Sequence, residues 1–275
     1  MTINLAQRSR RLAVRISRHE RSIVADIARE RRPQLEYGGP PFVLDVDRVT
    51  ADLLALRREL PDVRIHFSTT SLPHPAVIRA VDAFGASFAV AGRSEIDTLE
   101  REGVAIGRCL HVHPVKTVAD ITGSYLRGIR TFVVDSADEI AKFQELPDVA
   151  VLVRLAFPAP AAESGPMSTF GVAPRDARAL VDHCLRAGVR VAGFTFQVGT
   201  PTSRAASWTH AIRRTLALMR RLERTSGIRF DTLDLGGGLP VAYREPASGL
   251  AGLARDIRAA LADAPSRYRI VIETA

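Results

Sequence analysis

The stretch "TFVVDSADEIAKFQELPDVAVLVRLAF", residues 131–157, decides the fold. Two short runs rich in valine, residues 131–135 and 149–155, lie on either side of a stretch with helical spacing at residues 136–145. Both runs are almost continuously apolar, which is typical of strands that are buried on both faces. A strand, a helix and a second strand in this order predict a βαβ unit with parallel strands and a right-handed crossover.

The same alternation continues in both directions along the chain. Apolar runs predict further strands at residues 63–68, 87–91, 109–113, 191–198, 232–235 and 269–273. Helical stretches separate them at residues 74–84, 93–102, 117–125, 174–187, 204–226 and 247–263. Eight strands within about 210 residues favour an α/β fold, the closed (β/α)8 TIM barrel. An open doubly wound sheet is the alternative.

The first 45 residues do not follow this alternation. Apolar residues recur at helical spacing between Leu12 and Ile27, and residues 33–41 are rich in proline and glycine. The segment "FVLD", residues 42–45, has the composition of a short strand. We therefore expect an N-terminal helical arm and linker over residues 1–41, followed by a barrel domain over residues 42–275.

Composition and charge limit the class of protein. The 275 residues carry a formal net charge of +8, almost wholly as arginine, with lysine only at Lys116 and Lys142. Aromatic residues make up 6 % and do not alternate with basic ones, so we expect no nucleic-acid partner. No apolar run reaches the roughly 18 residues of a membrane helix, and the N-terminus lacks an apolar signal core, which favours a cytoplasmic protein. Cys109 and Cys184 lie in apolar segments and indicate buried thiols rather than a disulfide framework or a zinc site.

The functional groups of a TIM barrel lie at the carboxyl ends of its strands. The most specific signal there is "LDLGGGLP", residues 233–240, in which Gly236, Gly237 and Gly238 follow the seventh strand. Successive glycine N–H groups can form an anion-binding nest, and barrels often bind phosphate after strands seven and eight. We expect a phosphate site here; a tight turn that needs glycine is the alternative.

Other polar residues come to the same end of the barrel. Gln197 and Thr200 end the sixth strand, and Thr200 offers a hydroxyl and an N–H group to the same phosphate. Glu273 ends the eighth strand, where it can accept a hydrogen bond from a ring nitrogen or hold a cation. Arg154 is a charge inside an apolar strand, so it must be paired with a carboxylate or face a ligand.

Two further strand ends carry polar side chains. His111 and His113 share one face of the third strand, but no third ligand lies nearby, so we expect no metal site. The first strand runs into "RIHFSTTSLPHP", residues 64–75, where Thr69, Thr70 and Ser71 present small hydroxyls and no base. Three hydroxyls at the end of a barrel strand require an explanation.

Together these segments resemble the barrel domain of the fold-type III pyridoxal-phosphate-dependent ornithine/diaminopimelate/arginine decarboxylases, whose barrel is of the alanine racemase-like type. The resemblance spans residues 42–275 in the family's order. The segments that carry it are "PFVLDVDRV", "GASFAVAGRSEI", "HVHPVK", "FVVDSADEI", "FTFQVGT", "LDLGGGLP" and "VIETA". The resemblance implies that the glycines of residues 236–238, with Thr200, hold the cofactor phosphate. It also implies that Glu273 pairs with the pyridine nitrogen and that Arg154 lies beside the cofactor.

The chain departs from the family's pattern at several positions. Aligning "PAVIRA", residues 75–80, with the family's helix places Thr70 where the Schiff-base lysine stands, and a threonine forms no imine. Gln197 replaces the histidine that stacks on the cofactor, and Ala89 replaces an acidic residue. The family's C-terminal β-domain has no counterpart, so we expect an exposed barrel edge that a second copy, in a homodimer, or another chain covers.

Three functions remain open at this level. The first is a degenerate, catalytically silent decarboxylase-like barrel that binds a small phosphate-bearing ligand or amino acid, with pyridoxal 5'-phosphate held without a covalent bond or not at all. The second is an active pyridoxal-phosphate-dependent decarboxylase or racemase that uses an unusual amine or free cofactor. The third is a non-enzymatic protein-interaction module. Thr70 and Gln197 favour the first.

Overall fold

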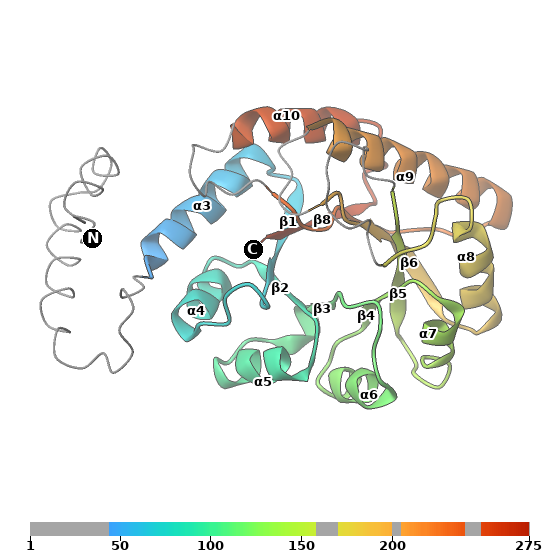
Figure 1. Cartoon of the computed structure of the whole chain (residues 1–275), viewed down its shortest axis with the longest axis horizontal. Helices are drawn as coiled ribbons and strands as arrows, with labels where there is room; N and C mark the ends of the chain where they lie inside the picture. Colours follow the sequence, from blue (N-terminus) through green and yellow to red (C-terminus); the bar gives the residue numbers. More distant parts are fainter. Residues whose placement is uncertain (1–43, 158–169, 200–204, 240–248, 275) are drawn as a thin grey trace, which may run out of the picture. The chain divides into compact units, whose positions relative to one another are not determined.

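The fold is a closed barrel of eight parallel strands in the order β1-β2-β3-β4-β5-β6-β7-β8, with helices around its outside (Figure 1). The computed structural model describes residues 44–157, 170–199, 205–239 and 249–274. Each strand pairs in parallel with the next, and β8 pairs with β1 to close the ring. The predicted TIM barrel is confirmed, and the open doubly wound sheet is wrong.

The strands match the predicted ranges closely. They are β1 Val63–Ser68, β2 Ser87–Val90, β3 Leu110–His111, β4 Thr131–Val134, β5 Ala150–Leu155, β6 Arg190–Phe196, β7 Thr232–Asp234 and β8 Arg269–Thr274. The helices are α3 Val46–Glu59, α4 Pro75–Ala83, α5 Arg93–Arg101, η1 Ile106–Arg108, α6 Val118–Leu126, α7 Ala137–Ala141, α8 Ala177–Arg186, α9 Ala205–Ser226 and α10 Leu250–Leu261.

The core lies mainly between the strands and the surrounding helices. Val151 and Val153 of β5 are fully buried in this outer layer, together with Trp208 of α9 and Ile257 of α10. A smaller apolar cluster is separate from this layer and consists of Leu110, Val133, Ala150, Leu152 and Ala192. These two clusters explain why β4 and β5 read as continuous apolar runs in the sequence.

Polar side chains form a layer on strands β5–β8 and β1. Strand register places Arg154 beside Thr195 and Thr195 beside Asp234. On the closing pair of strands, the same register places His66 beside Glu273. Because residues that pair across parallel strands point to the same face, these side chains lie together near the carboxyl ends of β5–β8 and β1.

The N-terminal part of the chain differs from the prediction. The compact barrel unit begins at Val46, with helix α3, which the sequence analysis did not predict. The predicted strand at residues 42–45 is wrong at Leu44 and Asp45, which lie in no strand; residues 42 and 43 fall outside the described residues. Leu44 is 37 % exposed, so it lacks the neighbours that a sheet strand would have. The predicted arm of residues 1–41 also lies outside the described residues.

Local capping fixes the helices that follow β3 and β4. Thr117 caps α6 in a capping box with Asp120, and the Ser136 hydroxyl accepts a hydrogen bond from the Glu139 N–H group at the start of α7. Helix α7 has only five residues, shorter than the predicted stretch of 136–145. Helix α7 carries Glu139, the acidic partner of Lys116 and Lys142 that is described below.

Two further predictions concern the cysteines and membrane-spanning helices. Cys109 and Cys184 are free, buried thiols, as expected. Within the described residues, no helix is both long enough and apolar enough to cross a membrane.

Candidate functional site

A cavity of about 250 Å³ opens at the carboxyl ends of the strands. Its walls come from residues on or just after each of the eight strands, from Ser68 on β1 to Glu273 on β8. The lining residues are Ser68, Ala91, Val112, His113, Pro114, Val133, Arg154, Phe170, Thr195, Phe196, Gln197, Gly236 and Glu273. Three predicted site residues, Arg154, Gln197 and Glu273, therefore meet in one cavity.

Arg154 lies largely buried in the wall of this cavity. Its Nη2 donates a hydrogen bond of 2.8 Å to the Gln197 side-chain oxygen, and its guanidinium lies 5.7 Å from the centre of the Phe170 ring. The buried Nε has no hydrogen-bond partner among the described residues. Burial lowers the pKa of Arg154, which the charges of Glu273, Asp135 and Asp234 oppose. The Arg154 Nε–H group is thus left to donate a hydrogen bond to a ligand.

Glu273 is joined to a second carboxyl group that the sequence analysis missed. Asp234, fully buried on β7, shares a hydrogen bond with the Glu273 side chain. The Thr195 hydroxyl donates to Asp234 Oδ2 at 2.7 Å, and the Gly236 N–H donates to Asp234 Oδ1 at 3.0 Å. An aspartate inside the buried run "TLDLG" is the signal that could have found it, because a buried carboxylate needs partners.

The three glycines have different roles. Gly236 and Gly238 have φ values of +66° and +106°, and a Cβ at either position would overlap a backbone oxygen, that of Phe196 or of Gly199. A Cβ on Gly237 would only touch Glu273, at 3.7 Å. The close approach of the loop after β7 to the loop after β6 therefore explains Gly236 and Gly238 as a tight turn. Of the three, Gly236 alone lines the cavity, and phosphate binding stays a prediction.

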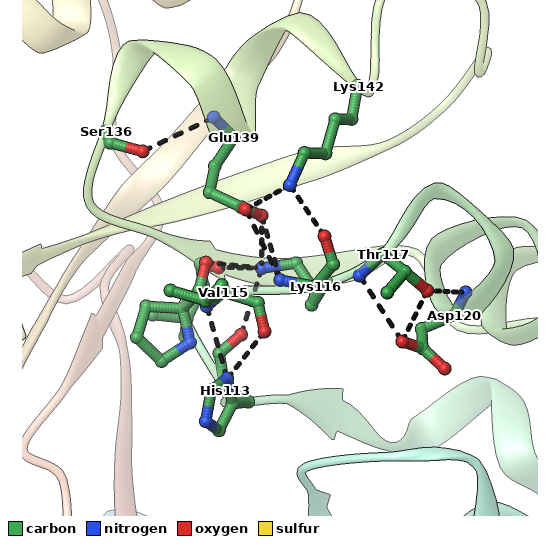
Figure 2. A network of polar contacts seen from close by, with 10 residues as sticks. His113, Val115, Lys116, Thr117, Asp120, Ser136, Glu139 and Lys142 are labelled. Atoms are coloured by element: carbon green, nitrogen blue, oxygen red, sulfur yellow. Dashed lines mark hydrogen bonds and ion pairs between the residues drawn. The ribbon is translucent and has the colours of Figure 1, made fainter.

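Both lysines are used in a polar network around the β3–α6 connection (Figure 2). Lys116 Nζ donates to the backbone oxygens of His113, Pro114 and Val133 at 2.9, 2.9 and 2.6 Å. It also lies 3.4 Å from a Glu139 carboxylate oxygen, and its side chain is 1 % exposed. Burial lowers the pKa of Lys116 to about 8, an effect that Glu139 opposes.

Lys142 completes this network from the end of α7. Its amine donates to the Lys116 backbone oxygen at 2.6 Å and forms an ion pair with Glu139 (Figure 2). The Glu139 carboxylate also accepts the Lys116 N–H group, at 3.2 and 3.3 Å. Neither lysine lines the cavity. Every primary amine among the side chains of this sequence is therefore bound at a structural position.

The hydroxyls after β1 lie at the edge of the cavity. Ser68, which lines it, shares a hydrogen bond of 2.8 Å with Thr70, so the two hydroxyls are on the same side of the chain. Thr70 is exposed, whereas Thr69 is fully buried. Thr70 thus stands two residues beyond a cavity-lining serine, and its alignment with the family's lysine stays a prediction.

The two histidines of "HVHP" do not form a metal site. His111 is fully buried and stacks on Phe132 with ring centres 5.6 Å apart. His113 lines the cavity and its Nδ1 contacts the Val115 backbone oxygen at 2.6 Å. Among the described residues, no group of three His, Cys, Asp or Glu side chains could hold a metal ion.

Thr200, predicted for the phosphate site, lies outside the described residues. Glu95 accepts the Ala91 N–H at 2.7 Å at the start of α5, within the helix predicted at residues 93–102.

The cavity fits a pyridoxal phosphate cofactor only in part. The cavity-lining Glu273 suits a ring nitrogen, and the Arg154 Nε, which has no hydrogen-bond partner among the described residues, suits an anion. The covalent attachment does not fit, because Thr70 has no amine and the Lys116 amine already donates to three backbone oxygens. The residues present therefore suit a non-covalent ligand.

Comparisons with known proteins agree with this architecture. A curated ornithine decarboxylase of Leishmania donovani is 29 % identical over 237 residues, covering 84 % of this chain and 33 % of that protein. A diaminopimelate decarboxylase of Actinosynnema pretiosum is 30 % identical over 86 % of this chain and 56 % of its own length. The chain thus spans about one third to one half of these curated relatives.

A solved structure and a family model extend the match. The lysine/ornithine decarboxylase of Vibrio vulnificus, solved with cadaverine, matches with a TM-score of 0.84 at 30 % identity, over 94 % of this chain and 67 % of that one. The family model described as "Pyridoxal-dependent decarboxylase, pyridoxal binding domain" matches residues 46–274, the whole barrel. By this match and by its barrel, the chain belongs to the family of pyridoxal-dependent decarboxylase pyridoxal-binding domains.

Proposed function

We propose that this barrel binds a small phosphate-bearing ligand of the pyridoxal type without a covalent bond and is silent as a decarboxylase by itself. The observation that carries the proposal is where the primary amines of the lysine side chains lie. The alignment assigns Thr70 to the lysine position, and Lys116 and Lys142 are both bound in the network with Glu139. An imine to the cofactor needs a free primary amine, and this chain holds none at the cavity.

The chain's own residues have separate roles in this proposal. The N–H groups of Gly237 and Gly238, with Thr200, bind the phosphate, since the Gly236 N–H group already donates to Asp234. Glu273 contacts the ring nitrogen, and Arg154 offsets the charge of the carboxyl groups beside it. Gln197, held by Arg154, borders the ring in place of a stacking histidine. Pyridoxal phosphate, when bound, supplies an electron sink for carbanion chemistry at an amino acid.

Titration of the purified chain with pyridoxal phosphate tests the proposal. We expect saturable binding that inorganic phosphate competes away, with no imine absorbance and no borohydride-stable adduct on Lys116 or Lys142. Peptide mass spectrometry locates any adduct. An adduct on Lys116 in the folded chain contradicts the proposal, and so does a complete lack of binding.

The variant Thr70→Lys tests the alignment itself. We expect it to form an imine that borohydride traps on residue 70, because Thr70 shares its hydroxyl contact with the cavity-lining Ser68. Ser71→Lys, one residue further on, is the matched control and should form no comparable adduct. Equal adducts on both variants would indicate non-specific reaction at an exposed loop.

A decarboxylase or racemase that uses free cofactor is the second candidate. It is favoured by the acid group Glu273, which remains in the cavity together with Arg154. Incubating the chain with pyridoxal phosphate and ornithine, lysine or diaminopimelate, and measuring released carbon dioxide, tests it. We expect no release above that of the cofactor alone.

Exposed apolar side chains near the lysine network are the basis for proposing a protein partner. Val115, Val118 and Leu126 are 54, 60 and 78 % exposed on α6 and the loop before it. We propose that a second copy of this chain covers these side chains, in a homodimer. Light scattering should then give twice the chain mass, and Val118→Asp should return it to the monomer mass.

A further inference from the structure

We infer that Glu273 stands in the mouth cavity as a neutral carboxylic acid whose proton is held by an anionic Asp234, so that Asp234 acts as a positioning residue for a proton donor. The inference deepens the proposed function, because it concerns the group that would meet the ligand's ring nitrogen. Its main test does not depend on any ligand.

The hydrogen-bond pattern assigns the proton. A hydrogen bond between two carboxyl groups requires that one of them carries a proton. Both Asp234 oxygens already accept a hydrogen bond, from the Thr195 hydroxyl at 2.7 Å and from the Gly236 N–H at 3.0 Å. These donors stabilise the anionic form of Asp234, so the shared proton belongs to Glu273.

The surroundings of Glu273 leave it no better partner. On β5, Arg154 acts on it through charge, but its described hydrogen bond goes to Gln197. On β1, the register partner His66 is buried, and burial with the nearby arginines lowers its pKa to about 4, so it is neutral at pH 7. Asp234 on β7 is therefore the charged group that Glu273 contacts. Burial and the charge of Asp234 both raise the pKa of Glu273 well above its ordinary value.

A buried acid of this kind has a chemical consequence for the site. A neutral Glu273 cannot attract a ligand by a full negative charge, but it can donate its proton to a basic ring nitrogen that arrives unprotonated. After that transfer, the carboxylate and the protonated ring form an ion pair beside Asp234 and Arg154. The proton then comes from the protein and not from solvent.

Infrared spectroscopy of the ligand-free chain tests the assignment. We expect a protonated-carboxyl band at pH 7 that disappears in Glu273→Gln. Asp234→Asn should lose the band at a lower pH than the native chain does, because burial still raises the pKa of Glu273 whereas the charge of Asp234 no longer does. Asp135→Asn is the matched control: Asp135 also acts on Arg154 but accepts its hydrogen bond from the Gly171 N–H, so the band should remain.

Each other outcome overturns the inference. No such band at pH 7 means that Glu273 is ionised. A band that survives in Glu273→Gln but not in Asp234→Asn places the proton on Asp234. A band that Asp234→Asn loses at the same pH as the native chain shows that burial alone protonates Glu273 and removes the role of Asp234.

Stability measurements give an answer even if Asp234→Asn fails to fold. The folded-state pKa of Glu273 is raised, so its contribution to stability is present at acidic pH and is lost as pH rises through the folded value. Glutamine reproduces the neutral donor to Asp234. We therefore expect Glu273→Gln to match the native chain near pH 4, below the ordinary glutamate pKa of 4.5, and to exceed its free energy of unfolding increasingly as pH rises from there towards the folded-state pKa. A constant difference at all pH values contradicts the inference.

Pyridoxine 5'-phosphate separates this inference from the proposed function. This probe has the ring nitrogen and phosphate but no aldehyde, so it cannot form an imine. If it does not bind while the Glu273 band is present, the proposed function fails and the inference stands. If it binds, the band should be lost on saturation, because the proton moves to the ring; a band that persists overturns the donor role.

Discussion

The two sides of the barrel mouth treat their buried charges differently. The lysine network, consisting of Lys116, Glu139 and Lys142, satisfies its charged groups with backbone atoms and with each other. The acid site, consisting of Arg154, Asp234 and Glu273, leaves the buried Arg154 Nε without a partner among the described residues. Buried polar groups are normally hydrogen-bonded, so an exception at a cavity indicates a ligand position. The comparison therefore indicates that the lysine network serves stability and that the acid site serves ligand binding.

The largest effect is expected where the acid site depends on backbone packing. Gly236→Ala places a methyl group onto the Phe196 carbonyl oxygen at a positive φ, and we expect a loss of more than about 4 kcal/mol in the free energy of unfolding, or no folded protein. Chemical denaturation measures it. Gly237→Ala is the control, since its methyl group has an ordinary contact with Glu273, and it should cost less than about 1 kcal/mol.

Breaking the lysine network is expected to have the next largest effect. Lys116→Met leaves three backbone oxygens without a donor and Glu139 with Lys142 alone, which should cost about 3–5 kcal/mol of stability. Lys142→Met, at a side chain that is 26 % exposed, should cost much less. Denaturation midpoints and pyridoxine phosphate affinity are measured together. A Lys116→Met chain that is fully stable but has lost ligand affinity would show that Lys116 serves ligand binding and not stability.

Acid should weaken both sides through one buried histidine each. Burial lowers the pKa of His66, beside the acid site, to about 4, and that of His111, on β3, to about 3. A depressed pKa gives stability that is present above the unfolded value of 6.5 and is lost as pH falls towards the folded value. His66 alone should account for about 3 kcal/mol between pH 6.5 and 4.

Variants separate the two histidines. His66→Leu and His111→Phe should each flatten the acid limb of a plot of unfolding free energy against pH. If neither variant changes that limb, these histidines do not control acid stability.

The smallest effect is expected at the hydrogen bond that orients Arg154. Gln197→Ala removes the acceptor of the 2.8 Å bond and should cost about 1 kcal/mol of stability. Gln144→Ala, at an exposed position after α7, is the control and should be neutral. A Gln197→Ala chain as stable as the control would show that Arg154 finds another partner.

Most of the fold could be predicted because its signals are local. Apolar runs and helical spacing located all eight strands, and the cavity forms at their carboxyl ends as the barrel rule requires. Helix α3 was missed, because the segment 42–45 before it was interpreted as a strand with the barrel beginning there. The site was predicted at Arg154, Gln197 and Glu273, whereas Asp234 was missed. Its position in a buried run indicates that it needs a partner, but not that the partner is a residue 39 positions away.

The sequence by itself determined which amines the chain offers: residue 70, which the alignment assigns to the family's lysine position, is threonine, and lysine occurs only at Lys116 and Lys142. The tertiary structure alone decided where those two amines are. Lys116 reaches the Val133 backbone oxygen and Glu139, and Glu273 reaches Asp234, through contacts between separate strands and helices. Such contacts depend on strand register and on the closure of the barrel, because these bring distant segments together, and a residue's neighbours in sequence do not encode them.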